Sequence, residues 1–304
     1  MTDAPLPDAA RGNWVDRRAP AALRPWLKLG RFDRPAGIWL LMLPGWQGAA
    51  LAGASGWELG RLLLLIAVGA AVMRAAGCAF NDVVDRDLDR KVARTAARPV
   101  ASGLISRKAA FAYVVGLSLV GLAVLLQLDL AAVGLGVLSL GLVAAYPFMK
   151  RITWWPQAWL GLTFNWGALL GYAAVRGVLE APALLLYASG VAWTLGYDTI
   201  YALQDLEDDA LAGVKSSARR LGRSAPRGVA AFYLACALLL LAALGAAHAR
   251  PLGFAAWFGF ALHLAWQARR VRVGDPAGAL ALFKSNRDAG LMAFAACLLA
   301  LHPI

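Results

Sequence analysis

The chain has 304 residues, 60% of them hydrophobic, and a net charge of +12. Ordinary soluble domains are about 45–50% apolar, so this composition excludes a typical soluble domain. Repeated apolar runs of about 20 residues indicate an all-α, polytopic membrane protein, and the alternation that a membrane β-barrel needs is absent. The cations lie between these runs, which favours an anionic membrane surface over nucleic acid as their partner.

Residues 1–30 form a polar N-terminal tail, and residues 31–304 are predicted to form one transmembrane domain. The tail segment 23–32 has the composition of a helix lying in the membrane interface, and a disordered tail is the alternative. Pro44-Gly45 is expected to kink the first span. Nine transmembrane helices are predicted, over residues 35–54, 61–80, 109–127, 130–148, 157–176, 181–202, 228–249, 251–268 and 288–302.

The positive charges divide unevenly between the two sides of this bundle. Of the 30 Lys and Arg residues, 26 lie in the tail and in the loops on its side. Arg61, Arg176 and Arg250 lie in the opposite loops, and Arg74 lies within a span. The positive-inside rule therefore predicts a cytoplasmic N-terminus and an external C-terminus. We expect a bacterial inner membrane, because the acids of the tail argue against a mitochondrial transit peptide.

An acidic stretch, Asn81-Asp-Val-Val-Asp-Arg-Asp-Leu-Asp89, directly follows the second span. Asn81, Asp85 and Asp89 are spaced i, i+4, i+8 and so share one face of a helix. Like charges at this spacing repel unless a cation lies among them, and Mg²⁺ prefers a few carboxylates completed by water and substrate phosphate oxygens. The stretch predicts half of a metal–diphosphate site, and a solvated helix end is the alternative.

A second acidic stretch, Tyr201-Ala-Leu-Gln-Asp-Leu-Glu-Asp-Asp209, follows the sixth span on the same side. Asp205 and Asp209 repeat the spacing of Asp85 and Asp89, and Tyr201 lies one turn earlier. Two such clusters at matched helix ends favour one split Mg²⁺ site over two solvated helix ends.

Basic residues near both stretches fit a substrate that carries phosphate. Arg74 lies about two turns below Asn81 in the second span, and a membrane-buried arginine indicates function because its burial is costly. We expect it to hold a deeper anionic group such as a carboxylate, and an ion pair with a buried acid is the alternative. Asp198 is the matching charge in the sixth span. The phosphate-binding candidates, each with membrane anchoring as the alternative, are Lys91, Arg94, Arg98, Lys150, Arg151 and Lys215.

These residues resemble the UbiA superfamily of intramembrane prenyltransferases. The first stretch is similar to that family's motif N-D-x-x-D-x-x-x-D, and residues 198–209 are similar to its motif D-x-x-Y-A-x-x-D-x-x-D-D. Four further stretches resemble its 4-hydroxybenzoate polyprenyltransferase branch, namely residues 31–37, 73–78, 94–99 and 146–156.

The resemblance implies a nine-helix bundle around a central cavity open to the cytoplasmic side, which a polyprenyl diphosphate enters from the lipid. It implies transfer of the prenyl group to the ring carbon ortho to the hydroxyl of 4-hydroxybenzoate, with release of diphosphate, as a membrane step of ubiquinone biosynthesis. Two Mg²⁺ ions would be held by Asn81, Asp82, Asp85, Asp89, Asp205, Asp208 and Asp209.

Further roles follow from the same resemblance. Lys91, Arg94 and Lys150 would stabilise the leaving diphosphate. Arg74, helped by Arg31 or Arg34, would hold the aromatic carboxylate. Asp198 would accept or orient the phenol proton, and Tyr201 would position diphosphate or aromatic. The catalytic candidates are therefore Asp85, Asp89, Asp205, Asp209, Asp198 and Tyr201.

Two alternatives stay open. One is a prenyltransferase of the same superfamily with another acceptor, such as a naphthoate, homogentisate, haem or a lipid glycerol. The other is an ion-coupled transporter. Transporters place their acids near the midplane on broken helices, whereas these acids lie at span ends, which disfavours the second alternative.

Overall fold

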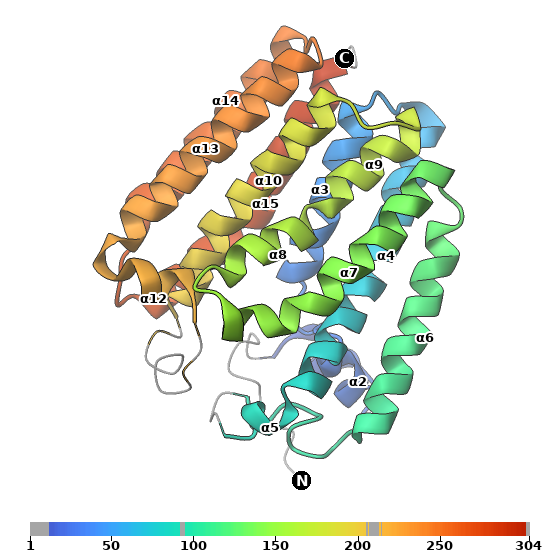
Figure 1. Ribbon diagram of the computed structural model, residues 1–304, viewed down its shortest axis with the longest axis vertical. Coiled ribbons are helices and arrows are strands. Elements are labelled where there is room, and N and C mark those ends of the chain that lie inside the picture. The colour runs from blue at the N-terminus through green and yellow to red at the C-terminus, as the bar shows by residue number, and fades with distance from the viewer. Residues whose placement is uncertain (1–11, 92–94, 205, 207–212, 214, 302–304) are drawn as a thin grey trace. The chain divides into compact units, whose positions relative to one another are not determined.

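A computed structural model describes residues 12–91, 95–204, 206, 213 and 215–301, with only the backbone of Lys150. Regular structure in this part of the chain is helical, with no strand, which confirms the predicted all-α class (Figure 1). The helices are α1 (Trp14–Arg18), α2 (Arg24–Leu29), α3 (Ala36–Leu51), α4 (Gly56–Val84), α5 (Arg86–Asp89), α6 (Arg107–Leu125), α7 (Leu130–Ile152), α8 (Pro156–Phe164), α9 (Trp166–Arg176), α10 (Ala181–Ala202), α12 (Ser217–Leu221), η1 (Gly222–Ser224), α13 (Ala225–Ala246), α14 (Pro251–Arg270) and α15 (Pro276–Leu301).

Each predicted span coincides with helix, but two differ in detail. The fifth is divided into α8 and α9 at Asn165, whose backbone leaves the helical conformation and whose amide donates to the Gly161 carbonyl at 2.9 Å. The ninth, α15, begins at Pro276 rather than near residue 288. Pro44 lies inside α3, which is assigned as one helix.

Four stretches of the described chain are long and apolar enough to cross a membrane by length and composition. They are Gly56–Val84, Arg107–Leu125, Leu130–Met149 and Ser217–Ala246. Large apolar side chains such as Leu64, Leu119 and Leu138 are more than 60% exposed on these helices, as expected of a surface that meets lipid. The total of nine spans stays a prediction.

The chain divides into two compact units, and the first comprises Met1–Trp39 and Ala67–Val124. Its core contains Leu29 of α2, Ala79 of α4 and Val100 of the following loop, all fully buried. The Trp26 ring lies 5.4 Å from that of Tyr113 on α6. The interfacial helix predicted over residues 23–32 corresponds to α2. This helix packs against the end of α4 that carries the first aspartates.

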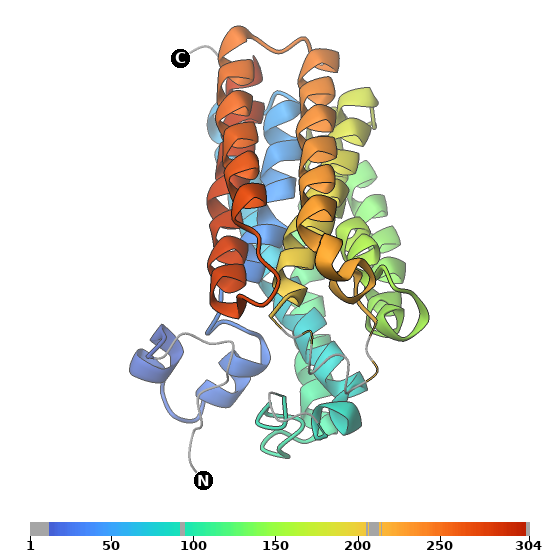
Figure 2. The same ribbon diagram turned by 90° about the vertical axis from the view of Figure 1, so that its left-hand side faces the viewer.

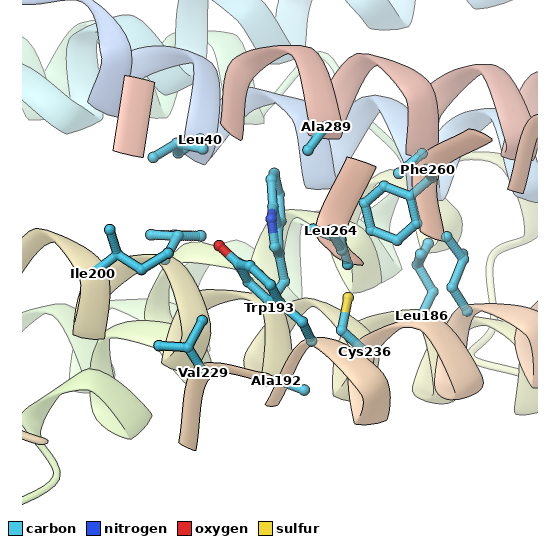
Figure 3. Close-up of a cluster of buried hydrophobic side chains, with 14 of the residues drawn as sticks. Leu40, Leu186, Ala192, Trp193, Ile200, Val229, Cys236, Phe260, Leu264 and Ala289 are labelled. Carbon is cyan, nitrogen blue, oxygen red and sulfur yellow. The ribbon is translucent and has the colours of Figure 1, made fainter. Parts of the chain in front are cut away.

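The second unit comprises Leu40–Ile66 and Leu125–Ile304. In it α10, α13, α14 and α15 run side by side (Figures 1 and 2) around an apolar core that includes Trp193, Phe260 and Leu264 (Figure 3). The backbones of α3 and α9 are in close contact. A Cβ added at Gly48 would lie only 2.1 Å from the Ala168 carbonyl oxygen. Small residues allow this close approach of membrane helices.

Candidate functional site

The first aspartate-rich stretch lies where α4 passes into the short helix α5. Asn81 and Asp82 are in the last turn of α4, Asp85 lies at the break, and Asp89 ends α5. The Asp85 amide donates to the Asn81 carbonyl and the Asp89 amide to the Asp85 carbonyl, both at 2.8 Å. Asn81, Asp85 and Asp89 thus follow one another at helical turns, as their spacing predicts.

Three of these carboxylates are removed from solvent. Asp82 is 1% exposed, Asp85 0% and Asp89 6%. Buried carboxylates require cations or hydrogen-bond donors, because desolvation of an isolated charge is very costly. A solvated helix end, the alternative interpretation of this stretch, is therefore wrong.

Arg31 provides the first cation. Its Nη2 donates to both oxygens of Asp82, at 2.7 and 3.0 Å, and its Nη1 donates to the Lys28 carbonyl at 3.0 Å. Burial alone would lower the pKa of Arg31, but nearby negative charge, chiefly Asp82, outweighs it and raises the pKa, so this arginine stays charged. Its φ of +62° is unfavourable for a residue with a side chain, by about 1 kcal/mol or more. The ion pair opposes this cost and fastens the segment after α2 to the end of α4.

Arg98 provides the second cation and bridges two acids. Its Nη1 donates to Asp89 Oδ2 at 2.9 Å and to Asp82 Oδ1 at 3.3 Å. Burial raises the pKa of Asp89, Arg98 opposes this, and Asp82 and Asp85 raise it further. Arg98 thus links the carboxylate at the end of α4 to the one at the end of α5.

The described residues supply donors of the kind that Mg²⁺ binds. Asn81 and the three buried aspartates offer hard oxygen ligands. No group of three or more His, Cys, Asp or Glu side chains within the described part of the chain has the geometry of a metal site. A complete set of ligands would need further donors, and the predicted ones, Asp205, Asp208 and Asp209, lie outside the described residues.

Arg74 is half-buried on α4, and its guanidinium lies against Gly37 at the start of α3. A Cβ added at Gly37 would lie 2.6 Å from Arg74 Nε. Only glycine at this position leaves enough space for the Arg74 side chain. Four stretches of the sequence resemble the 4-hydroxybenzoate polyprenyltransferase branch. Three of them contribute an arginine to the first unit, namely Arg31, Arg74 and Arg98.

The other predicted cations have varied surroundings. Arg34 pairs with its neighbour Asp33 at 3.1 Å, and Lys215 Nζ donates to the Ile152 carbonyl at 3.2 Å. Lys91 and Arg151 are exposed. Arg94 and the side chain of Lys150 lie outside the described residues.

The second aspartate-rich stretch begins at the end of α10, in the second unit. Asp198 and Tyr201 are half-buried there. The Tyr201 ring lies 4.6 Å from that of Phe283 on α15, and Phe283 also contacts Tyr197, with 6.0 Å between centroids. The end of α10 is thus aligned with α15 by aromatic contacts.

A buried network of neutral polar groups joins the same helices one to two turns away. Trp193 Nε1 donates to Asn286 Oδ1 at 2.8 Å, and the Tyr233 hydroxyl donates to Gln267 Oε1 at 2.7 Å. Asn286 Nδ2 donates to the same Gln267 oxygen at 3.2 Å. None of these four side chains is more than 2% exposed. The sequence alone did not predict this network. Gln267 inside an apolar segment is a signal for it, whereas Asn286 stands among charged residues.

Comparison with known proteins agrees with this arrangement. The UbiA prenyltransferase family matches residues 41–298. The chain is also 44% identical over 286 residues to 4-hydroxybenzoate polyprenyltransferase, mitochondrial, of Bos taurus, covering 92% of this chain and 76% of the relative.

The prediction of a bacterial inner membrane is wrong. The relatives from Bos taurus, Homo sapiens and Arabidopsis thaliana are mitochondrial enzymes by name, which contradicts it. The prediction rested on the acids of the N-terminal tail, which do not decide the membrane. The bias of Lys and Arg could not test it, because that bias distinguishes the two sides of a membrane and not one helical membrane from another.

Solved structures match over most of the chain. A UbiA homologue from Aeropyrum pernix K1 is 26% identical, with a TM-score of 0.72 over 85% of this chain and 96% of that one. A UbiA homologue from Archaeoglobus fulgidus, bound to GPP and Mg²⁺, is 18% identical, with a TM-score of 0.65 over 90% of this chain and 99% of that one. With a family match over residues 41–298 and a relative of 44% identity, the chain belongs to the UbiA prenyltransferase family.

Proposed function

We propose that this protein transfers a polyprenyl group from polyprenyl diphosphate to 4-hydroxybenzoate, at the ring carbon ortho to the hydroxyl, and releases diphosphate. The reaction is a membrane step of ubiquinone biosynthesis, carried out in a mitochondrial membrane. The observation that carries this proposal is the buried cluster of Asp82, Asp85 and Asp89 with Arg31 and Arg98, in a chain 44% identical to an enzyme of that name.

The acidic cluster is the proposed binding place of Mg²⁺. The proposed ligands are Asn81, Asp85 and Asp89 of the first aspartate-rich stretch and Asp205, Asp208 and Asp209 of the second, with two ions as the expected number. When bound, Mg²⁺ would supply positive charge to the oxygens of the leaving diphosphate. The Archaeoglobus fulgidus protein, which shares this fold, binds GPP and Mg²⁺, the two ligands that acidic and basic residues here would take.

The chain's own cations bind the diphosphate in this account. Arg98 lies at the acidic cluster, and a guanidinium can donate two parallel hydrogen bonds to phosphate. Lys91, Arg94 and Lys150 are the further candidates. As the allylic C–O bond breaks, its electron pair passes to the diphosphate, and fixed positive charge beside those oxygens lowers the barrier.

Arg74 is the proposed anchor of the acceptor's carboxylate, with Arg34 as a helper. Arg31, the other predicted helper, is bound to Asp82 at 2.7 Å, so we give it a role in holding that residue. The ring carbon then forms the new C–C bond and loses its proton. Asp198 would accept or orient the phenol proton, and Tyr201, whose ring lies 4.6 Å from that of Phe283, would position diphosphate or aromatic.

The test uses membranes that contain the full-length protein, incubated with 4-hydroxybenzoate, geranyl diphosphate and Mg²⁺. We expect a prenylated 4-hydroxybenzoate and an equal amount of diphosphate, both lost on chelation of Mg²⁺. Reaction of a naphthoate or homogentisate, but not of 4-hydroxybenzoate, would overturn the acceptor assignment. Absence of diphosphate release with every acceptor would overturn the prenyl transfer itself and revive the transporter alternative.

A further inference from the structure

We propose that Arg98 is a built-in counter-cation of the acidic cluster that competes with the divalent metal for Asp89. When the metal binds, Arg98 releases Asp89 and donates to the diphosphate, while Asp82 keeps it at the site. This inference rests on the proposed function and adds a residue that links metal binding to diphosphate binding.

The two acids that share Arg98 differ in their other partners. Asp82 also receives both hydrogen bonds from Arg31, at 2.7 and 3.0 Å, so its charge is balanced without Arg98. Asp89 forms its ion pair with Arg98, at 2.9 Å. Arg98 is closer to Asp89 than to Asp82, which lies 3.3 Å away. Its departure from Asp89 would therefore leave one buried carboxylate in need of a cation and leave Asp82 neutralised.

Hydrogen bonds hold the backbone on either side of Arg98, so a movement of the side chain is enough for the exchange. Thr95 Oγ1 donates to the Asp89 carbonyl at 2.9 Å, and the Arg98 amide donates to the Thr95 carbonyl at 2.9 Å. Two residues further on, Val100 is fully buried and Arg90 Nε donates to the Ala101 carbonyl at 2.7 Å. The Arg98 side chain itself is 18% exposed and long enough to turn from a carboxylate to a nearby phosphate.

Arg31 contrasts with Arg98 in each of these respects. Its side chain is 10% exposed, its Nη2 donates to both oxygens of one acid, and its backbone is in the left-handed region. These features indicate that the ion pair between Arg31 and Asp82 stays formed when the metal and the diphosphate bind. Asp82 is then a positioning residue that holds two arginines, rather than one of the metal ligands that the family resemblance implies.

Electrostatics gives the consequence for binding. A guanidinium 2.9 Å from Asp89 Oδ2 repels a divalent cation that approaches the same oxygen, so the metal alone binds weakly. A diphosphate supplies a new acceptor for Arg98 and removes this repulsion. The metal and the prenyl diphosphate therefore each increase the affinity for the other. This coupling depends on the Arg98 side chain.

The experiment measures binding of Mn²⁺, as a substitute for Mg²⁺, to the purified full-length protein in detergent by electron paramagnetic resonance, without diphosphate. We expect Arg98→Gln to bind Mn²⁺ about fivefold or more tightly than the natural protein. The same variant should have a KM for prenyl diphosphate that is higher by about tenfold, because a charge-assisted hydrogen bond is lost. Its KM for 4-hydroxybenzoate should be unchanged.

Two further variants make the result specific. Arg107→Gln removes the exposed ion pair to Asp87, 2.7 Å long and also at α5, and should leave Mn²⁺ affinity and both KM values unchanged. Arg98→Lys keeps the charge and should bind Mn²⁺ as weakly as the natural protein. It serves as the test if Arg98→Gln fails to fold: Mn²⁺ binding fivefold tighter in Arg98→Lys would overturn the proposal.

Unchanged or weaker Mn²⁺ binding by folded Arg98→Gln would also overturn the proposal, even if prenyl transfer by the natural protein is intact. Failure of the proposed function has a different signature, namely absence of prenylated product with the natural protein. The two failures are therefore distinguishable.

Discussion

The ends of α4 and α10 each lead into an aspartate-rich stretch, yet their side chains are held in different ways. At the end of α4, Asp82 and Asp89 are held by the charged side chains of Arg31 and Arg98. The end of α10 is held by neutral hydrogen bonds and ring contacts to α13, α14 and α15. Charged partners can be exchanged for a metal or a phosphate, whereas a neutral buried network fixes a helix in one register.

The two kinds of contact also differ in energy. Removal of one partner from a buried ion pair costs about 3–5 kcal/mol, because a charge is left without compensation. A typical neutral hydrogen bond contributes about 0.5–1.5 kcal/mol. Substitutions can therefore test the difference between α4 and α10. The effects on stability should be larger at the charged contacts of α4 than at the neutral contacts of α10.

The largest effect is expected on turnover, from loss of an acid in either stretch. Asp85→Ala or Asp205→Ala should lower kcat by about a thousandfold or more, since each removes charge stabilisation of the leaving group. Steady-state release of diphosphate measures this, with far-ultraviolet circular dichroism as the check of folding. Turnover within tenfold of the natural protein in either variant would contradict the two-stretch metal site.

Asp82→Asn should cause the largest loss of stability. It leaves Arg31 and Arg98 beside a neutral amide in a buried place, at a cost of about 3–5 kcal/mol. Denaturant unfolding in detergent micelles measures the change in free energy of unfolding. The matched control is Asp87→Asn, because Asp87 pairs with Arg107 in solvent, where an ion pair contributes little to stability. Equal effects of the two substitutions would show that Asp82 does not fasten unit one.

Arg74→Ala should act on acceptor binding. Loss of a charge-assisted hydrogen bond to the carboxylate predicts a KM for 4-hydroxybenzoate about 10-fold to 100-fold higher, with the KM for prenyl diphosphate unchanged. Gly37→Ala sharpens the test, because its Cβ would displace the Arg74 guanidinium while leaving the charge in place. An unchanged acceptor KM in Arg74→Ala would remove its role as carboxylate anchor.

The smallest effect is expected from the neutral network of the second unit. Tyr233→Phe deletes the hydroxyl that donates to Gln267 and should lower the free energy of unfolding by about 1 kcal/mol, with kcat nearly unchanged. Unfolding and steady-state kinetics measure both quantities. A tenfold fall in kcat would mean that this network does more than hold α10 in register.

Much of the fold could be predicted from the sequence, because apolar runs mark membrane helices directly. The exceptions have local causes. Asn165 lies where the fifth span divides, its side-chain Nδ2 donates to the Gly161 carbonyl, and no Pro within that span predicts the break. The start of α15 was placed too late because Lys284, Ser285, Asn286 and Arg287 interrupt the apolar run, although Pro276 is a good first residue of a helix.

The sequence predicted which residues belong to the candidate site. It did not predict which of them form ion pairs with one another. Helical spacing relates Asn81, Asp85 and Asp89 to one another, since all three belong to one continuous stretch. Arg31 and Asp82 are 51 positions apart, and only the folded chain brings them together. Arg98 was predicted to bind phosphate, but its bridge between Asp82 and Asp89 follows from the loop after α5, which no periodicity describes.

The central claim is that this protein joins a prenyl group to 4-hydroxybenzoate and that the buried acids make this reaction dependent on a divalent metal. The most direct measurement is mass spectrometry of the products formed by the purified protein from ring-labelled 4-hydroxybenzoate and geranyl diphosphate, during a titration with Mg²⁺. We predict one labelled product that carries a geranyl group, whose rate rises with Mg²⁺ and vanishes in Asp85→Ala. A geranylated product that forms equally well without divalent metal, or in Asp85→Ala, would contradict the account.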